Sequence, residues 1–327
     1  MNCTAGNFVR KIMKAIVLNE FGGVDQLLMT EVPVPIISDD EVLVEVKAIS
    51  INPVDVRTRQ GSAMADHLKN NHPLILGWDI SGVIKETGKN VSRFSKGDEV
   101  FGLVNFLGHG QGYAEYVAAP EAHLARKPTN ISHEQAAAAT LSALTAWQLL
   151  NNYAKLKAGE SILILAASGG VGHFAVQMAS YVGASVIGVS SAKNREFVLG
   201  LGADEHIAYD EKEFKDIISE VDVVLDAFSG DSLFKSLQVV KQKGIILSLL
   251  PFISEEVLQK AKLKEVDVHY ELVHSSGADM DIIAGLLAKG AIKPYVSELF
   301  PFEEMAKAHL CMESNRTVGK IIVQVSK

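Results

Sequence analysis

The stretch LILAASGGVGHFAVQMA, residues 163–179, constrains the fold of this chain more than any other. A run of apolar residues stops at a turn of small residues and then restarts with helical spacing. A buried strand that ends in a glycine-rich turn and opens a helix is typical of a parallel sheet covered by helices. The stretch therefore predicts an α/β domain around it.

The residues that follow repeat the alternation of strand and helix. SVIGVS is a predicted strand, AKNREFVLGLG a helix closed by glycine, and VDVVLDA and KGIILSLL are two further strands. Upstream, an Ala- and Leu-rich helix begins at Ser132, and Gln135 three positions later completes a capping box. We predict a parallel sheet covered by helices on both faces over residues 130–265, which the resemblance described below identifies as a doubly wound Rossmann domain.

The flanking segments follow a different pattern. Residues 14–125 are rich in β-branched residues and are interrupted by Gly, Pro and Asp turns, which predicts a compact β-barrel domain. The tail ends in GKIIVQV, an amphipathic strand that we expect to rejoin that barrel. The predicted barrel domain therefore combines residues 13–129 with 266–327, and residues 1–12 form a flexible extension.

Charge and cysteine content exclude several classes of protein. The net charge is −8 and the isoelectric point about 5.7, whereas broad nucleic-acid or anionic-membrane binding needs a basic face. The sequence contains no run of 18 apolar residues, so we expect no membrane-spanning helix. Two cysteines far apart, Cys3 and Cys311, indicate a reducing compartment, and we expect a cytoplasmic protein.

The small-residue turn matches the dinucleotide fingerprint G-x-G-x-x-G except at its first position, which is Ala167. Its glycines let the backbone approach a pyrophosphate and let the helix pack closely on the strand, while the first helical N–H groups face the phosphates. The alternative is a glycine-rich helix start with no ligand. The predicted cofactor-binding residues in the turn are Ser168, Gly169, Gly170, Val171 and Gly172.

The end of the second strand indicates which nucleotide is bound. NAD enzymes usually place an acid there for the ribose 2′-hydroxyl, but this chain has Ser190, followed by Ser191, Lys193 and Arg195. Hydroxyls and cations accept a 2′-phosphate, and each charge-assisted contact contributes about 1.5–3 kcal/mol. We therefore predict NADPH as cofactor; for Lys193 and Arg195 the alternative is a solvated helix face.

These motifs, together with those of the first domain, resemble the medium-chain dehydrogenase/reductase superfamily, and within it the zinc-independent quinone oxidoreductase branch that includes zeta-crystallin. The match runs in order through nearly the whole chain after residue 12. The matching segments are MKAIVLNEFGG, EVLVEVKAISINPVDVRTRQG, LGWDISGVI, FSKGDEVFG, GYAEYV, AAATLSALTAWQLL, AASGGVG, LGADEHIAYD and GKIIV.

The resemblance implies a GroES-like catalytic domain, an inserted Rossmann domain, and a cleft between them for nicotinamide and substrate. It also accounts for Ala167, because this branch typically reads A-A-x-G-G-V-G. Where zinc alcohol dehydrogenases have metal ligands, this chain has Asn52, Trp78 and Leu141, none a good zinc ligand. We therefore predict no metal site.

Without a Lewis acid, hydride transfer suits an acceptor that is already electron-poor. We predict reduction of quinones, by hydride or electron transfer, with reduction of enones or alkenals as the alternative. By resemblance, the catalytic candidates are Asn52, Asp55 and Tyr113. Asn52 would also contact the cofactor, although it and Asp55 would serve equally as loop caps and Tyr113 as a core residue.

The resemblance adds cofactor-binding candidates outside the turn. Helix packing is the alternative for Thr145, and a solvated loop is the alternative for Tyr209. These candidates are Thr140, Thr145, Tyr209, Asp226, Gly319 and Lys320.

Two other functions remain open. One is an NADPH-binding structural or regulatory protein with little turnover, and the other is an enoyl reductase acting on a carrier-bound substrate. Relatives commonly pair an edge strand of the Rossmann sheet. We therefore expect a homodimer, or a tetramer, built on GIILSLLPF at 244–252.

Overall fold

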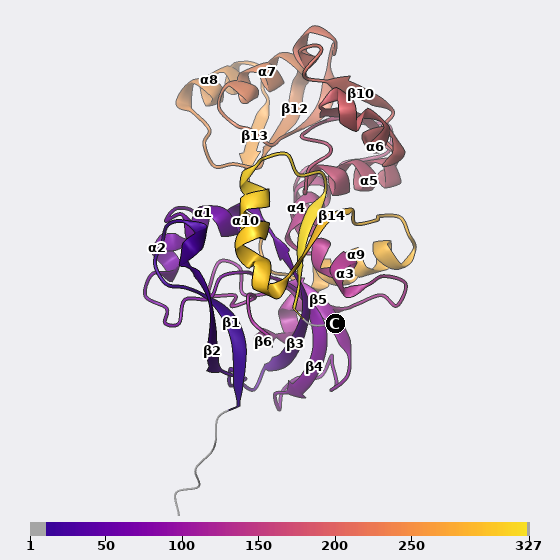
Figure 1. Ribbon diagram of the computed structural model, residues 1–327. Coiled ribbons are helices and arrows are strands. Elements are labelled where there is room, and N and C mark those ends of the chain that lie inside the picture. Colours follow the sequence, from indigo (N-terminus) through magenta and orange to yellow (C-terminus); the bar gives the residue numbers. More distant parts are fainter. Residues whose placement is uncertain (1–10, 326–327) are drawn as a thin grey trace, which may run out of the picture.

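The computed structural model describes residues 11–325. It forms a barrel-like domain, in the lower half of Figure 1, and a Rossmann domain, in the upper half. The C-terminal segment returns to the barrel side, where its strands join the sheet of the first domain. The predicted extension at 1–12 lies almost wholly outside the described residues.

The Rossmann domain contains one six-stranded parallel sheet in the order β10-β9-β8-β11-β12-β13. Its apolar strands are buried by helices because successive parallel strands need crossover connections. The strands are β8 (Ser161–Leu165), β9 (Ser185–Ser190), β10 (Glu205–Ala208), β11 (Val221–Asp226), β12 (Val240–Ser248) and β13 (Asp267–Tyr270). The helices along this part of the chain are α4 (Leu141–Trp147), α5 (Gly172–Val182), α6 (Arg195–Gly200), α7 (Asp231–Val239) and α8 (Glu255–Leu263). α3 (His133–Ala138), predicted as part of this domain, packs instead on strands of the barrel sheet.

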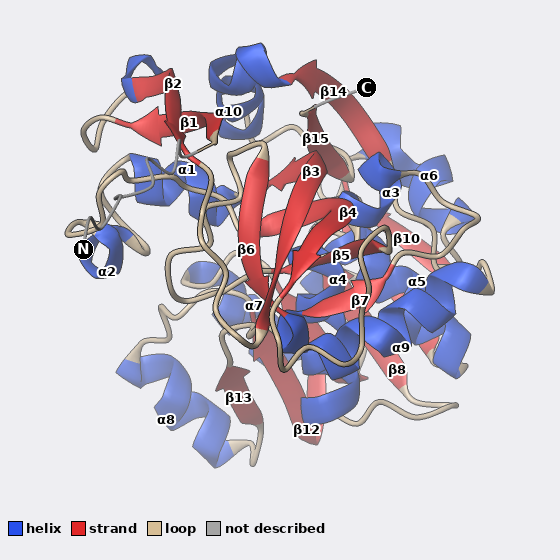
Figure 2. Ribbon diagram, turned by 90° about the horizontal axis from the view of Figure 1, so that it is seen from below, coloured by secondary structure: helices blue, strands red, loops and turns tan. Residues whose placement is uncertain are grey.

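The first domain is built on a seven-stranded sheet with an additional two-stranded hairpin, β1–β2. Figure 2 shows the molecule from below, with β15 beside β3 and β14 beside β15. The strands are β1 (Ile12–Leu18), β2 (Leu27–Pro33), β3 (Glu41–Ile51), β4 (Asp79–Thr87), β5 (Glu99–Leu103), β6 (Tyr116–Pro120), β7 (Leu124–Arg126), β14 (Val296–Pro301) and β15 (Lys320–Gln324). The helices are α1 (Pro53–Arg59), α2 (Ala65–Leu68), α9 (Gly277–Ala288) and α10 (Met305–Glu313).

Three predicted features differ from the structure. The Rossmann segment does not end at 265, because β13 pairs in parallel with β12 and extends the sheet to Tyr270. That strand, and not 244–252, forms this edge of the sheet, because β12 lies between β11 and β13; β10 forms the opposite edge. β15 rejoins the barrel as predicted, but four of its five residues are buried, so it is not amphipathic.

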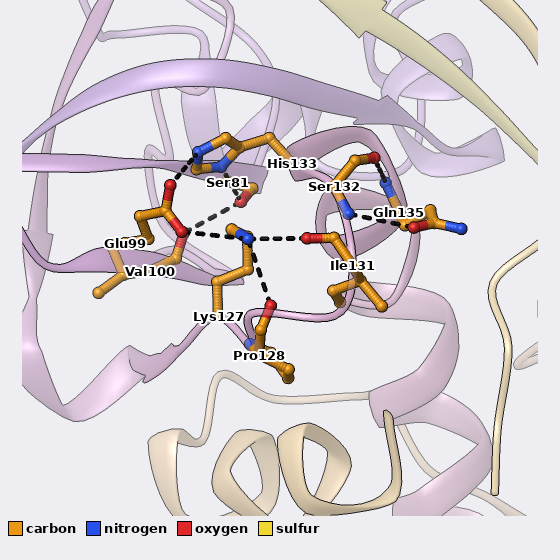
Figure 3. Close-up of polar contacts among 9 residues, drawn as sticks. All are labelled: Ser81, Glu99, Val100, Lys127, Pro128, Ile131, Ser132, His133 and Gln135. Carbon is orange, nitrogen blue, oxygen red and sulfur yellow. Dashed lines mark hydrogen bonds and ion pairs between the residues drawn. The ribbon is translucent and has the colours of Figure 1, made fainter. Parts of the chain in front are cut away.

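The predicted capping box at the start of α3 is confirmed. The Gln135 backbone N–H donates to Ser132 Oγ over 3.3 Å, and the Ser132 N–H donates to Gln135 Oε1 over 3.1 Å (Figure 3). The next residue, His133, lies against the barrel, with Nδ1 2.8 Å from Ser81 Oγ and Nε2 3.3 Å from Glu99 Oε1. The cap therefore begins the helix where it contacts strands β4 and β5.

None of the helices in the described part of the chain is long and apolar enough to cross a membrane.

Candidate active site

The glycine turn between β8 and α5 has the geometry of an anion cradle. Its one left-handed residue is Ala166, with φ of 52°, so Ala167 stands in ordinary backbone and its side chain is buried. An added Cβ at Gly172 would lie 2.1 Å from the Ala166 carbonyl oxygen, so only glycine allows the helix to start here. Ala167 is thus compatible with this turn, whereas Gly172 is indispensable to it.

Backbone donors at this turn are available for a ligand. Within the described residues, no acceptor is found for the N–H groups of Gly170 and Val171, which immediately precede α5. Gly169, Gly170 and Val171 are half-buried, so the turn remains accessible. Free N–H groups at the positive end of an 11-residue helix bind phosphate groups. The turn therefore fits the pyrophosphate of a dinucleotide.

The C-terminal strand is attached to this turn. The Gly319 N–H donates to the Ser168 carbonyl oxygen over 2.8 Å. Gly319 has φ of 63°, and an added Cβ would lie 2.3 Å from the Tyr295 carbonyl oxygen. The side chain of Ser168 accepts a hydrogen bond from Asn194 Nδ2 over 3.0 Å. The turn is therefore held from both the last strand and the segment after β9.

Beside the turn lies a buried polar cluster of Asn52, Asp55, Asp79, Ser142 and Lys320, each at most 2% exposed. Asn52 Nδ2 donates to Asp79 Oδ2 over 2.7 Å, and Lys320 Nζ donates to Asn52 Oδ1. Lys320 Nζ also donates to Ser142 Oγ over 3.1 Å. Asp55 Oδ2 accepts from the Asn52 N–H over 2.7 Å, so the predicted role of Asp55 as a loop cap is confirmed.

Burial strongly shifts the titration of this cluster. Burial, and then the charge of Asp79, raises the pKa of Asp55 to about 8. Burial raises the pKa of Asp79 as well, against the nearby Lys320 ammonium, and lowers the pKa of Lys320. Two carboxyl groups facing one ammonium group carry one excess negative charge, and a protonated Asp55 removes it.

Two of the three positions compared with zinc ligands meet at Asp79, and all three donors are already used. Asn52 and the Leu141 N–H both donate to the Asp79 carboxylate, the latter over 3.1 Å. Trp78 Nε1 donates instead to the Gly108 carbonyl oxygen over 2.8 Å. In residues 11–325, no group of three or more His, Cys, Asp or Glu side chains is arranged to hold a metal ion. The donor set here, an amide, an indole and a backbone N–H, does not fit zinc.

The end of β9 gathers the residues predicted to recognise the 2′-phosphate. Ser190 is 2% exposed and its Oγ lies 2.8 Å from His206 Nε2, while Lys193 and Tyr209 are exposed. The exposed Arg195 is already paired, with Nη2 2.9 Å from Glu211 Oε2. Ser191, which follows Ser190 in the sequence, is half-buried. The region therefore contains two exposed cations, Lys193 and Arg195, and Arg195 forms an ion pair with Glu211.

Other predicted residues have structural partners. Thr140 Oγ1 donates to the Ala137 carbonyl oxygen over 2.7 Å, and Thr145 Oγ1 donates to that of Leu141 over 2.8 Å, as in ordinary helix packing. Asp226 is fully buried and accepts from the Ser229 N–H and from Ser236 Oγ. It therefore shapes the turn after β11, and its cofactor contact stays a prediction.

Tyr113 is packed in the barrel, and its predicted pocket-lining role stays a prediction. Its ring is fully buried against Gly77, where an added Cβ would lie 2.2 Å from Tyr113 Cδ1. Its hydroxyl lies 3.0 Å from Nε2 of the equally buried His309. Burial raises the pKa of Tyr113 well above its ordinary value. Tyr113 is a core residue of the barrel.

Comparisons with known proteins agree with this architecture. Residues 38–129 match the family described as alcohol dehydrogenase GroES-like domain, and residues 201–323 match zinc-binding dehydrogenase. A chloroplastic NADPH-dependent alkenal/one oxidoreductase of Arabidopsis thaliana is 35% identical over 99% of this chain and 82% of the relative. The chain belongs to the medium-chain dehydrogenase/reductase superfamily.

Two further relatives cover this superfamily member almost completely. A human quinone oxidoreductase is 30% identical over 96% of this chain and 98% of its own length. The solved structure of a quinone oxidoreductase from Coxiella burnetii superposes with a TM-score of 0.91, at 35% identity, over 97% of this chain and all of the other. Like these relatives, this superfamily member is an oxidoreductase.

Sequence reasoning missed several residues of the site. Asp79, Ser142, His173 and His206 lie in or beside it, and none belongs to the dinucleotide fingerprint. His173 is fully buried on α5, with Nδ1 2.9 Å from the Gly169 carbonyl oxygen, and burial lowers its pKa to about 4. The one available signal was Asp79, an acid inside an otherwise apolar segment.

Proposed function

We propose that this chain is an NADPH-dependent reductase of quinones from the zinc-independent branch of its superfamily. The observation that carries the proposal is the glycine turn, with the unpaired N–H groups of Gly170 and Val171 at the start of α5. Pyrophosphate fits this cradle. Ser190 at the end of β9, where an acid would repel a 2′-phosphate, supports NADPH over NADH.

Bound NADPH supplies the hydride, and the residues of the chain position the reactants. Lys320, Asn52 and Asp79 form a buried hydrogen-bonded cluster in the corner beside the turn, and this cluster fixes the walls against which the reactants are positioned. The Lys320 ammonium donates to the Ile51 carbonyl oxygen, Asn52 and Ser142 and faces the Asp79 carboxylate, so it is neither a free donor nor an uncompensated charge. An acceptor that is already electron-poor suits such a corner.

Reduction of an activated C=C bond is the second candidate. It is favoured by relatives named NADPH-dependent alkenal/one oxidoreductase and 2-methylene-furan-3-one reductase, the latter 32% identical over 95% of this chain. Both reactions place electron density on a carbonyl oxygen, and the same corner serves either. They differ in the acceptor atom, which is the β-carbon in an enone.

The cytoplasmic location and the homodimer are part of this proposal. The relatives compared include chloroplastic and mitochondrial proteins, so location is a property to measure on this chain. Acceptor small molecules are the only partners that the proposal requires.

The test is steady-state oxidation of NADPH and NADH by the purified protein, followed by nicotinamide absorbance. The acceptors are ortho- and para-quinones, short enones and alkenals, each with and without a chelator. We expect quinone turnover with NADPH that the chelator leaves unchanged. Turnover with enones alone would move the assignment to the second candidate. Tight NADPH binding without turnover of any acceptor would indicate a binding protein and contradict the proposal.

A further inference from the structure

A buried histidine supports the glycine turn from below, and the proposed function does not yet use it. His173 is the second residue of α5 and is fully buried. Its Nδ1 lies 2.9 Å from the Gly169 carbonyl oxygen, which also accepts from the His173 backbone N–H over 3.0 Å. One residue therefore approaches the same carbonyl group with both its backbone and its side chain.

The hydrogen bonds of the ring determine its tautomer. The Tyr295 backbone N–H donates to His173 Nε2 over 3.4 Å, so Nε2 is an acceptor and carries no hydrogen. Nδ1 then carries the ring hydrogen and donates it to the Gly169 carbonyl oxygen. Burial lowers the pKa of His173 to about 4, which keeps the ring in this neutral form at pH 7. Both ring nitrogens therefore have a defined partner.

The bond to Gly169 fixes the direction of the next N–H group. The Gly169 C=O and the Gly170 N–H belong to one planar trans peptide, so they point in opposite directions. Because the carbonyl oxygen faces His173 and the body of α5, the Gly170 N–H points out of the start of the helix. It has no acceptor among residues 11–325, and it is one of the two donors available to a pyrophosphate.

This peptide needs support because a glycine lies on each side of it. Glycine places few steric limits on the backbone, so a peptide between two glycines turns over more easily than others. A turned peptide would aim the Gly169 carbonyl oxygen, instead of the Gly170 N–H, at an anionic ligand, and the two would repel each other. The second bond to that carbonyl, from the His173 ring, opposes this change.

We propose that His173 is a positioning residue for cofactor binding, because its Nδ1–H holds the Gly169–Gly170 peptide in the orientation that directs the Gly170 N–H toward the pyrophosphate of a bound dinucleotide. The inference rests on the proposed nicotinamide-dependent function and deepens it. Tyr295, which donates to the other ring nitrogen, accepts from the Lys320 N–H over 2.8 Å. The same ring therefore also links the glycine turn to β15.

The experiment measures the dissociation constants of NADPH, NADH and 2′-AMP for the wild type, His173→Leu and His173→Asn. 2′-AMP retains the adenosine 2′-phosphate but lacks the pyrophosphate, so it reports on the rest of the nucleotide site. Leucine has a similar volume but no nitrogen, whereas the asparagine amide can donate from the place of His173 Nδ1.

Gln177→Leu is the matched control. Gln177 lies one helical turn later on α5, is buried, and exchanges two hydrogen bonds with the backbone of Lys293, close to Tyr295 in the same segment. It makes no hydrogen bond to the glycine turn among the described residues. The control therefore disturbs the packing of that segment on α5 and leaves the Gly169–Gly170 peptide untouched.

We expect His173→Leu to weaken the binding of NADPH and NADH alike by about tenfold, as loss of one hydrogen bond to a charged group would, and to leave 2′-AMP affinity unchanged. His173→Asn should recover most of this loss. Gln177→Leu should lower the melting temperature without changing dinucleotide affinity. Unchanged dinucleotide affinity in His173→Leu, or an equal weakening of 2′-AMP, would overturn the role of His173.

A measurement on the unaltered protein decides the point even if His173→Leu fails to fold. The nitrogen NMR spectrum of the His173 ring should show its hydrogen on Nδ1 at pH 7, and NADPH should slow hydrogen exchange of the Gly170 amide. A ring hydrogen on Nε2, or a Gly170 amide that NADPH leaves unprotected, would overturn the inference. A wild type that binds neither dinucleotide would overturn the proposed function itself, and a preference for NADH would overturn only the choice of cofactor.

Discussion

At the scale of single residues, the most unusual feature is a charged cluster with almost no access to water. Asp55, Asp79 and Lys320 share one buried site, and Asn52 bridges them. Burying unpaired charge is costly, so the cluster is stable only if its excess negative charge is removed. A proton on Asp55 removes this excess charge. Asp55 Oδ1 is buried and has no hydrogen-bond partner among the described residues, so it is the oxygen that carries the proton.

Asp55→Asn should change the pH dependence of stability. Native Asp55, with its pKa raised to about 8, retains its proton where the unfolded chain, near 3.8, has lost it. The native state therefore binds more protons between these values, and wild-type stability falls as pH rises through that range, by up to about 1.4 kcal/mol per pH unit. Asparagine cannot ionise and still accepts from the Asn52 N–H. Melting temperatures from pH 5 to 8 should therefore decline less in the variant.

The control for this change is Asp66→Asn, since the Asp66 side chain is 90% exposed. Its pH profile should follow the wild type. A decline in Asp55→Asn as steep as in the wild type would show that Asp55 is already ionised in the native protein.

At the scale of elements, local signals in the sequence predicted what local interactions determine. The Ser132–Gln135 box and the strand–turn–helix at 161–182 follow from residues close in sequence. β13 was missed because DVHY is short and half polar, as a strand at a sheet edge can be. The pairing of Ser190 with His206, and of Asn52 with Asp79, depends on neighbouring strands and loops, which no local pattern encodes.

Gly172→Ala should disrupt the turn between β8 and α5. The added methyl group would lie 2.1 Å from the Ala166 carbonyl oxygen, so the start of the helix must move away from β8. We expect loss of NADPH binding by at least tenfold together with a lower melting temperature, measured by titration and by thermal unfolding. Gly200→Ala on α6, where an added Cβ meets nothing within 4 Å, is the matched control; it should leave NADPH affinity unchanged and should not lower the melting temperature. Normal NADPH affinity in Gly172→Ala would contradict the assignment of the turn as the phosphate cradle.

At the scale of the whole molecule, the last strand connects the two domains. β15 pairs with β3 of the barrel, while Gly319 at its start donates to Ser168 in the glycine turn of the Rossmann domain. Lys320 extends the same connection to Asn52 of the barrel and to Ser142 on α4. The nucleotide cradle and the buried polar cluster are therefore positioned by one segment, although they belong to different domains.

The homodimer, if it forms through the Rossmann sheet, must use an edge strand, and the structure offers two. β10 and β13 both end the sheet, and an unpaired edge favours pairing with a second chain. β13 follows the strand named in the sequence-based prediction and is therefore the edge to test. Light scattering should give twice the 35.3 kDa of the chain. Hydrogen exchange should then show concentration-dependent protection of residues 267–270 on β13, with none at 205–208 on β10, which serves as the internal control. A mass of one chain at all concentrations would exclude the dimer, and protection confined to β10 would move the interface to the opposite edge.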